Sequence, residues 1–354
     1  MRDRILELAI AVQQVAAPTF EEKARADFVQ ATFNELNLLD VSQDELGNVY
    51  GRLAGDGAGD PLVAVAHLDT VFPNGTSLEV REEGDKVYGP GLGDNSVGVA
   101  ALVELAHLIR QRKIELGGDL WLVADVGEEG LGDLRGMRKV VERFGAQVQG
   151  YLIIEGLALG HVYHRAIGVR RYRVTARTAG GHSWSDYGQP SAVHELARLV
   201  TQITALHVPV TPRTTLNVGV IAGGTTINTL AEEAWFELDL RSENADSLAI
   251  LNEQVQKLIA AANRPGVSVE SRPIGQRPAG EIAVHHPLIQ LGIRCLEQQG
   301  LSGSLTAGST DANIPLSMGI PAVVLGVTTG GGAHTKREFI LSEPIEQGMN
   351  QLVC

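Results

Sequence analysis

Residues 62–69 read LVAVAHLD, and residues 120–129 read LWLVADVGEE. In both stretches an unbroken apolar run of strand length ends in histidine or acidic side chains, and residues 151–155 (YLIIE) repeat the pattern. Apolar runs without alternation are typical of strands buried on both faces, as in a sheet covered by helices. Together with the apolar run at 322–327, these stretches predict an α/β fold built on a helix-covered mixed sheet.

The middle of the chain has a different pattern, in which four strand-like segments alternate with two amphipathic helices. In chain order these segments are residues 169–177, 191–206, 215–221, 234–240, 246–262 and 267–271. The order β-α-β-β-α-β is the split βαβ arrangement of a small α+β domain. We therefore expect an inserted domain at residues 166–273 and a larger α/β domain formed by residues 1–165 and 274–354.

Charge and hydropathy exclude several classes of partner. The formal net charge of −13 argues against a nucleic-acid or anionic-membrane partner, because both need a basic surface. No apolar run approaches the roughly 20 residues of a membrane helix. Residues 1–15 are interrupted by Asp3, Arg4 and Glu7, unlike a signal peptide. The sequence therefore predicts a cytoplasmic protein without nucleic-acid or membrane partners.

Only two cysteines are present, Cys295 and Cys354, and they lie far apart in the sequence. This number and spacing indicate neither a disulfide framework nor a thiolate metal site. Any metal ion must therefore be bound by histidine and carboxylate side chains.

Two helix starts are recognisable in the sequence. Residues 19–22 (TFEE) match a capping box, which predicts a helix from there to about residue 36. Residues 89–95 (GPGLGDN) form a glycine-rich loop that opens a helix at about residues 97–112. The acid of this loop, Asp94, has two oxygens and can bridge two cations.

Candidate ligands follow four of the predicted strands. Ligands of open α/β sheets bind beyond the carboxyl ends of the strands, so these side chains are expected to meet. A set of histidines and carboxylates without cysteine suits zinc, although manganese or cobalt would also fit. We assign His67, Asp94 and Glu155 to one ion, and Asp94, Glu129 and His334 to a second ion.

Two further acids are left for other roles. Asp69 lies two residues after His67 and could hold the second nitrogen of that imidazole, which would determine its tautomer. Glu128 is next to a predicted ligand without being one, so it can take a proton from the attacking water and later give it to the leaving amine.

Each of these features also has an ordinary structural interpretation. A lone histidine after a strand is more often structural, a Glu-Glu pair is usually a solvated loop, and a glycine-rich loop alone is a weak turn signal. The prediction of a metal site depends on their occurring together, after four buried strands of one chain.

These residues resemble the metal and catalytic set of the M20 metallopeptidases, the group of carboxypeptidase G, peptidase T, aminoacylase and acetylornithine deacetylase. The matching motifs are His67-Leu68-Asp69, Gly93-Asp94-Asn95, Gly127-Glu128-Glu129, Glu155 and His334. The resemblance implies a zinc-peptidase domain with two co-catalytic Zn²⁺ ions and an inserted ferredoxin-like α+β lid domain. It also implies a possible homodimer formed through the lid.

The resemblance also implies roles for residues of the inserted domain. Residues 180–183 (GGHS) are similar to the family segment whose histidine reaches the active site, often from a neighbouring subunit, so His182 is the candidate for stabilising the oxyanion. Asn228 and Arg241 resemble the pair that binds a substrate carboxylate in the carboxypeptidase branch, although an arginine ending a strand is commonly just solvated. Arg277 is a further candidate of this kind.

Near the C-terminal end, residues 308–313 (GSTDAN) resemble a family segment beside the substrate pocket. We expect Asp311 to organise this loop and not to bind metal.

Hydrolysis of an amide bond in a small peptide or N-acyl amino acid is the function predicted from this set, with Glu128 as the general base. A deacylase of the acetylornithine or succinyl-diaminopimelate type would use the same metal centre. A non-catalytic binding or assembly protein with this fold should have lost a ligand or the base, and none is missing. A two-metal phosphatase or nuclease shares the carboxylate chemistry, but the acidic charge and the lid pattern argue against it.

Overall fold

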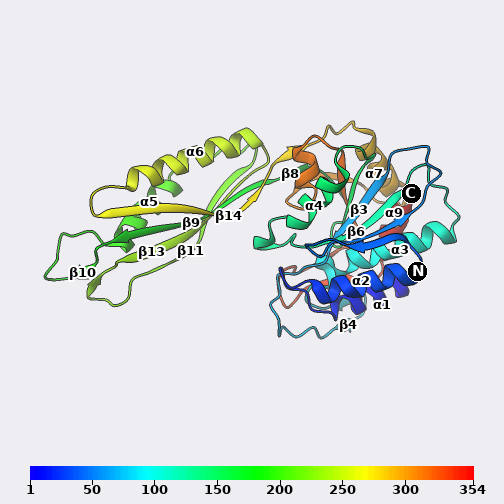
Figure 1. The fold of residues 1–354 in the computed structure, drawn as a ribbon, viewed down its shortest axis with the longest axis horizontal. Coiled ribbons are helices and arrows are strands. Elements are labelled where there is room, and N and C mark those ends of the chain that lie inside the picture. The colour runs from blue at the N-terminus through cyan, green and yellow to red at the C-terminus, as the bar shows by residue number, and fades with distance from the viewer. The chain divides into compact units, whose positions relative to one another are not determined.

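The computed structural model describes all 354 residues and divides the chain into two compact units (Figure 1). Unit 1 comprises Met1–Ala166 and Glu281–Cys354, and unit 2 comprises Ile167–Gly280. Each unit has its own cluster of buried apolar side chains, so each buries a separate core.

Unit 1 is built on a nine-stranded mixed sheet in the order β1-β2-β6-β3-β7-β17-β8-β15, with β16 paired to β8. The four central strands β6, β3, β7 and β17 run parallel, whereas β2 joins β6 antiparallel. In chain order the strands are β1 (Leu39–Gln43), β2 (Val49–Leu53), β3 (Leu62–His67), β6 (Leu120–Asp125), β7 (Gly150–Glu155), β8 (His161–Ala166), β15 (Gly280–Glu281), β16 (Ser304–Gly308) and β17 (Ala322–Gly326).

Helices surround this sheet, which explains the unbroken apolar runs of the central strands. Every residue of β3 from Val63 to His67 is buried, as are all five of β17, because both faces of these strands pack against side chains. The helices of unit 1 are α1 (Arg2–Gln13), α2 (Lys23–Glu35), α3 (Val97–Gln111), α4 (Arg135–Phe144), α7 (Pro287–Gln298), α8 (Asn313–Ser317) and α9 (Ile345–Val353). The α/β fold with a helix-covered mixed sheet is thus confirmed.

A second, four-stranded sheet in unit 1 has the order β18-β19-β5-β4. Its strands are β4 (Arg81–Glu83), β5 (Lys86–Tyr88), β18 (Gly330–Gly331) and β19 (Phe339–Leu341). The short helical turn η1 (Leu92–Ser96) follows β5 and leads into α3. This sheet therefore joins the chain before the glycine-rich loop to the chain around His334.

Unit 2 is a four-stranded antiparallel sheet, β11-β13-β9-β14, with two helices on one face (Figure 1). Alternate residues of β13 (Glu233–Ser242) are buried against α5 (Ala192–Thr204) and α6 (Ala245–Ala262), as the period of a half-buried strand requires. The remaining strands are β9 (Gly168–Thr178), β11 (Thr214–Gly223) and β14 (Val267–Arg277), and β10 (Gly181–His182) pairs separately with β12 (Thr229–Leu230).

The last strand of unit 2 is longer than the sequence pattern predicts. We expected a strand at 267–271 and a boundary at 273, but β14 continues to Arg277 and unit 2 continues to Gly280. Proline and glycine ordinarily end a strand, but a shift of register between Pro273 and Gly275 lets β14 continue beyond them.

Three smaller expectations need correction. Thr19 does not cap a helix: α2 begins at Lys23, and the Thr19 hydroxyl donates to Asp69 instead. Cys295 and Cys354 form a disulfide, because α7 and the chain after α9 lie side by side despite the sequence distance.

The third concerns membrane-spanning length. One helical stretch, Leu92–Gln111, is long and apolar enough to cross a membrane, and 89% of it is buried inside unit 1. Helices in protein cores commonly have this composition, so the stretch is weak evidence for a membrane span.

Candidate metal centre

The carboxyl ends of the parallel strands of unit 1 bring the predicted ligands to one edge of the sheet. His67 is the last residue of β3 and Glu155 is the last residue of β7. Glu128 and Glu129 follow β6, whereas Asp94 lies in η1. Because neighbouring parallel strands end at the same edge, residues far apart in sequence meet there.

Asp94 lies between the two histidines and contacts a different one with each oxygen. Its Oδ1 is 3.1 Å from His67 Nε2, and its Oδ2 is 3.0 Å from His334 Nε2. Glu155 Oε2 lies 3.8 Å from the same nitrogen of His67, and Glu129 Oε1 lies 3.1 Å from the same nitrogen of His334. The ligand atoms thus form two groups that share Asp94, each with one histidine and two carboxylates.

The pKa values show how strongly the acids and the histidines interact. Burial alone would lower the pKa of His67, but its bonds to Asp69 and Asp94 raise it well above its usual value. Hydrogen bonds to Asp94 and Glu129 raise the pKa of His334 to about 10. Burial raises the pKa of Glu155 well above its ordinary range, opposed by His67 and reinforced by Asp94. The side chains of this site therefore carry an excess of negative charge, which favours bound cations.

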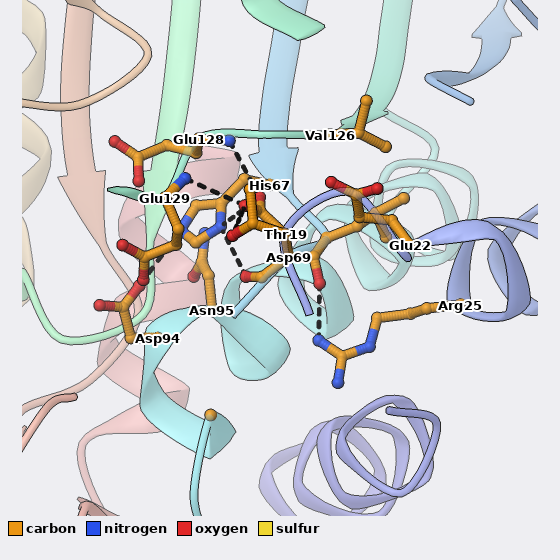
Figure 2. Close-up of polar contacts among 12 residues, drawn as sticks. Thr19, Glu22, Arg25, His67, Asp69, Asp94, Asn95, Val126, Glu128 and Glu129 are labelled. Atoms are coloured by element: carbon orange, nitrogen blue, oxygen red, sulfur yellow. Dashed lines mark hydrogen bonds and ion pairs between the residues drawn. The ribbon is translucent and has the colours of Figure 1, made fainter. Parts of the chain in front are cut away.

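Asp69 connects more of the site than the sequence predicts. The Nδ1 atom of His67 bonds the backbone carbonyl of Asp69 at 3.1 Å and lies 3.5 Å from its carboxylate. The carboxylate accepts the backbone N–H groups of Glu128 and Glu129 at 2.9 and 3.0 Å, and the Thr19 hydroxyl at 2.8 Å. Asp69 therefore holds the histidine and the Glu128-Glu129 segment together (Figure 2).

Glu128 is buried next to Glu129, and its side chain extends to the same side of the site as those of Glu129 and Asp94 (Figure 2). The charge of Glu128 raises the pKa of both His67 and Glu155, so Glu128 lies close to the predicted ligands. It belongs to neither of the two ligand groups. A carboxylate in this position can accept a proton from a water that lies between the ligands.

Supporting residues that the sequence did not reveal orient the ligands. The Asn95 side chain donates to Ile154 O and accepts from Gly156 N, both at 2.8 Å, so it holds the backbone on either side of Glu155. Arg25 is fully buried and donates to Leu68 O at 2.7 Å, between His67 and Asp69 (Figure 2). Such bonds leave no spacing pattern in a single sequence.

Two more buried acids, Asp125 and Asp311, lie close enough to influence each other. Burial and repulsion from Asp311 raise the pKa of Asp125 well above its ordinary value. Asp311 belongs to neither ligand group.

The remaining predicted residues belong to unit 2. His182 and Asn228 are neighbours, because β10 pairs with β12 and Ser183 N donates to Asn228 O at 3.0 Å. Arg241 is half exposed and bonds Asp239 at 2.7 Å, whereas Arg277 is buried.

Arg241 and Arg277 also occupy related positions in the sheet. Each pairs with Val169 of β9, from opposite sides, so both side chains lie on one face of the sheet.

The donor set of unit 1 fits divalent cations. Two histidines and three carboxylates, one of them shared, are the ligand types expected for zinc, and also suit manganese or cobalt. Without a bound cation, several buried carboxylates of this site would repel one another.

Comparisons with known proteins place these motifs in context. The model of Peptidase family M20/M25/M40 matches residues 63–354. The uncharacterised protein YqjE of Bacillus subtilis is 25% identical over 97% of this chain and 94% of its own length. Carboxypeptidase G2 of a Pseudomonas species is 28% identical, but only over 30% of this chain and 27% of its own.

Solved structures share the fold over the full chain. A tripeptidase from Staphylococcus aureus has a TM-score of 0.84 at 21% identity and covers 100% of this chain and 97% of its own. A dinuclear metal-binding peptidase from Bacillus subtilis has a TM-score of 0.73 at 15% identity, covering 99% and 96%. These identities are low, so the likeness establishes the architecture alone.

Proposed function

The chain belongs to Peptidase family M20/M25/M40 and is a metal-dependent hydrolase of peptide bonds. From this premise we propose that it cleaves an amide bond in a small peptide or an N-acyl amino acid, with two Zn²⁺ ions and with Glu128 as the general base. The observation that carries the proposal is the position of Asp94, whose two oxygens contact His67 and His334 separately.

His67, Asp94 and Glu155 would hold one ion, and Asp94, Glu129 and His334 would hold the other. When bound, the ions polarise the substrate carbonyl and make a water more acidic. Glu128 then takes the proton of the attacking water and passes it to the leaving amine, so one carboxylate serves as base and then as acid. Asp69 keeps this carboxylate in place through the backbone N–H of Glu128.

His182 would stabilise the negative charge that develops on the carbonyl oxygen. Its Nδ1 accepts the backbone N–H groups of Trp184 and Ser185 at 3.2 and 3.4 Å, so the ring proton resides on Nε2. An exposed Nε2–H is the donor that this role requires.

Arg241 would bind a free carboxylate of the substrate, with Arg277 as a second guanidinium. Asn228 lies beside His182 at the opposite end of β13, so within one chain it would contact a different part of the substrate. The pairing of both arginines with Val169 supports this assignment, because it puts two positive charges on one face of the sheet. A planar guanidinium binds a carboxylate through two parallel hydrogen bonds.

Replacing Glu128 by Gln tests the mechanism. The amide cannot accept the proton, so kcat should fall by roughly 10²- to 10⁴-fold while two ions per chain remain bound. Glu297→Gln, on the exposed surface of α7, is the matched control and should keep full activity. Turnover by Glu128→Gln at the wild-type rate would contradict the role of this residue.

A substrate panel separates the remaining functions. Dipeptides, tripeptides and N-acyl amino acids, with and without a free carboxylate, are assayed in zinc, manganese and cobalt. We expect hydrolysis that depends on the free carboxylate and is weakened by Arg241→Ala. Cleavage confined to N-acetyl or N-succinyl substrates would indicate a deacylase, phosphoester cleavage a phosphatase or nuclease, and no turnover a binding or assembly protein.

We also propose a homodimer formed through unit 2, which would be the lid. β11 is an edge strand of ten residues, and its Val220 and Ile221 side chains are exposed. A long apolar edge readily pairs with another strand. Sedimentation should show a dimer for the wild type and a monomer for Ile221→Lys. A cytoplasmic location stays a prediction from the sequence, which cell fractionation would test.

A further inference from the structure

Glu338 is a buried acid that no step of the proposed reaction uses. Its side chain is completely buried, and its carboxylate accepts three backbone N–H groups. Oε1 accepts from Gly93 at 2.7 Å and from Asp94 at 2.9 Å, and Oε2 accepts from Gly91 at 3.1 Å. All three donors belong to the glycine-rich loop that presents Asp94.

Glu338 is also close in sequence to His334, a second predicted ligand. Glu338 lies four residues after His334, in the segment between β18 and β19. Hydrogen bonds inside this segment, from Thr335 N to Gly332 O and from Glu338 N to Thr335 O, both at 3.0 Å, make it a compact turn. One side chain therefore links the loop of Asp94 to the turn of His334.

The backbone of Glu338 reinforces the link. Gly89 N donates to Glu338 O at 3.0 Å, and β19 pairs with β5 immediately before the loop. The loop is thus attached to the turn of His334 at its start through the backbone and at its end through the carboxylate.

A carboxylate suits this position better than any other side chain. It offers two acceptor oxygens and no donor, which matches three converging N–H groups. The amide of glutamine has the same shape but offers one acceptor oxygen, and its NH₂ group would face an N–H donor. Glu338→Gln therefore removes acceptor capacity with almost no change in volume.

We propose that Glu338 is a positioning residue that holds Asp94 opposite His334 and so preforms the Asp94, Glu129 and His334 ligand group. It acts through Asp94 and the turn of His334, because its carboxylate is buried and accepts from backbone N–H groups of the glycine-rich loop. The inference rests on the proposed two-ion centre. The other group also contains Asp94, but its two remaining ligands, His67 and Glu155, are held by β3 and β7 and not by Glu338.

Titration of the full-length protein with Co²⁺ or Zn²⁺, after removal of bound metal, tests this role. The wild type should bind two equivalents. In Glu338→Gln, the Kd of one equivalent should rise about 10- to 100-fold, the range typical for residues that orient metal ligands, while the other changes less. The visible spectrum of bound Co²⁺ should show that one of the two sites fills only at a higher Co²⁺ concentration.

Two controls separate positioning from general stability. Asp119 lies just before β6, and its carboxylate accepts the backbone N–H of Gly55 at 3.0 Å. Asp119→Asn removes the charge of this acid, and the variant should still bind two equivalents of metal. Glu338→Asp keeps the charge on a shorter side chain and should recover part of the lost affinity. Far-UV circular dichroism of each variant confirms folding, and Glu338→Asp decides the question should the glutamine variant not fold.

The outcomes distinguish this inference from the proposed function. Two equivalents bound by Glu338→Gln with wild-type affinities would overturn the positioning role and leave the two-ion centre intact. Equal weakening by Asp119→Asn would also overturn it, since the effect would then be general. Fewer than two equivalents in the wild type would instead refute the two-ion centre.

Discussion

Asp69 holds His67 and the Glu128-Glu129 segment through different groups. Its carboxylate accepts the N–H groups of Glu128 and Glu129, whereas the Nδ1 of His67 bonds mainly to its backbone carbonyl. We expect Asp69→Asn to lower kcat about 10- to 100-fold, because one acceptor is lost and the Glu128-Glu129 segment shifts. Steady-state kinetics measure this effect, and metal analysis shows whether His67 still binds.

A control separates the contacts of Asp69. Thr19→Val removes only the hydroxyl that donates to Asp69, at 2.8 Å, and keeps the carboxylate for both backbone groups. Its kcat should stay within a few fold of wild type. A larger loss in Thr19→Val than in Asp69→Asn would contradict this ranking of the contacts.

Asp239 predicts a contribution of unit 2 to stability that depends on pH. Burial would raise the pKa of Asp239, but hydrogen bonds from Arg241 and Arg171 outweigh it and hold the pKa below its usual range. A lowered folded-state pKa stabilises the protein above the unfolded value of about 3.9, and this contribution is lost as the pH falls through the folded-state pKa.

Denaturant unfolding of the wild type and Asp239→Asn from pH 7 to pH 3 measures this contribution. The wild type should be the more stable above about pH 5, and the difference should shrink below about pH 4. A difference that grows toward acidic pH would show that the sign is wrong.

How far the sequence predicts a residue's place depends on the kind of contact that the residue makes. His67 and Glu155 could be placed near each other because each ends a buried strand, and parallel strands end together. Thr19, Asn95 and Glu338 could not, because each bonds to a partner that lies 50 or more positions away in the chain. Long-range bonds of this kind, several of them to backbone atoms, carry no side-chain pattern.

At the scale of elements, the apolar runs predict which segments are buried strands, but local sequence signals predict poorly where a strand or helix begins and ends. The runs at 62–66 and 322–327 correspond to β3 and β17 because burial on both faces demands apolar side chains throughout. The end of β14 and the start of α2 were misplaced, since a bulge and a distant hydrogen bond decided them. Tertiary contacts outweigh local signals at such ends.

The close approach of β7 to η1 makes a prediction at this scale. A Cβ atom on Gly156 would lie 2.0 Å from Gly93 O and 2.5 Å from the side chain of Val97, so only glycine fits between the strand end and the loop. Gly156→Ala should separate Glu155 from Asp94 and destabilise the protein by about 1–3 kcal/mol. Thermal unfolding and metal content measure the two effects.

Gly117→Ala is the matched control. A Cβ atom on Gly117 meets nothing within 4 Å, so this variant should keep wild-type stability and metal content. Wild-type metal content in Gly156→Ala would show that the loop can move without disturbing the ligands.

At the scale of the whole molecule, the two units differ in what stabilises them. Both have a core of their own, but all five candidate metal ligands lie in unit 1. Along the chain, the apolar pattern changes from unbroken runs in the strands of unit 1 to alternation in the strands of unit 2. Unit 2 therefore depends on its own apolar packing, whereas unit 1 would gain further stability from cations bound by these ligands.

This difference predicts two separable unfolding transitions in calorimetry. Ligands that bind only the folded state stabilise it by mass action, by about 4 kcal/mol at a thousand-fold excess over Kd, so chelation should lower only the transition of unit 1. Phe236→Ala removes a buried ring from the core of unit 2 and should lower the free energy of unfolding of that unit by about 3–5 kcal/mol. Only the transition of unit 2 should then move to a lower temperature. Phe33→Ala, in the core of unit 1, should shift the chelator-sensitive transition instead. A single transition that moves as a whole in all three experiments would mean that the two cores unfold as one cooperative structure.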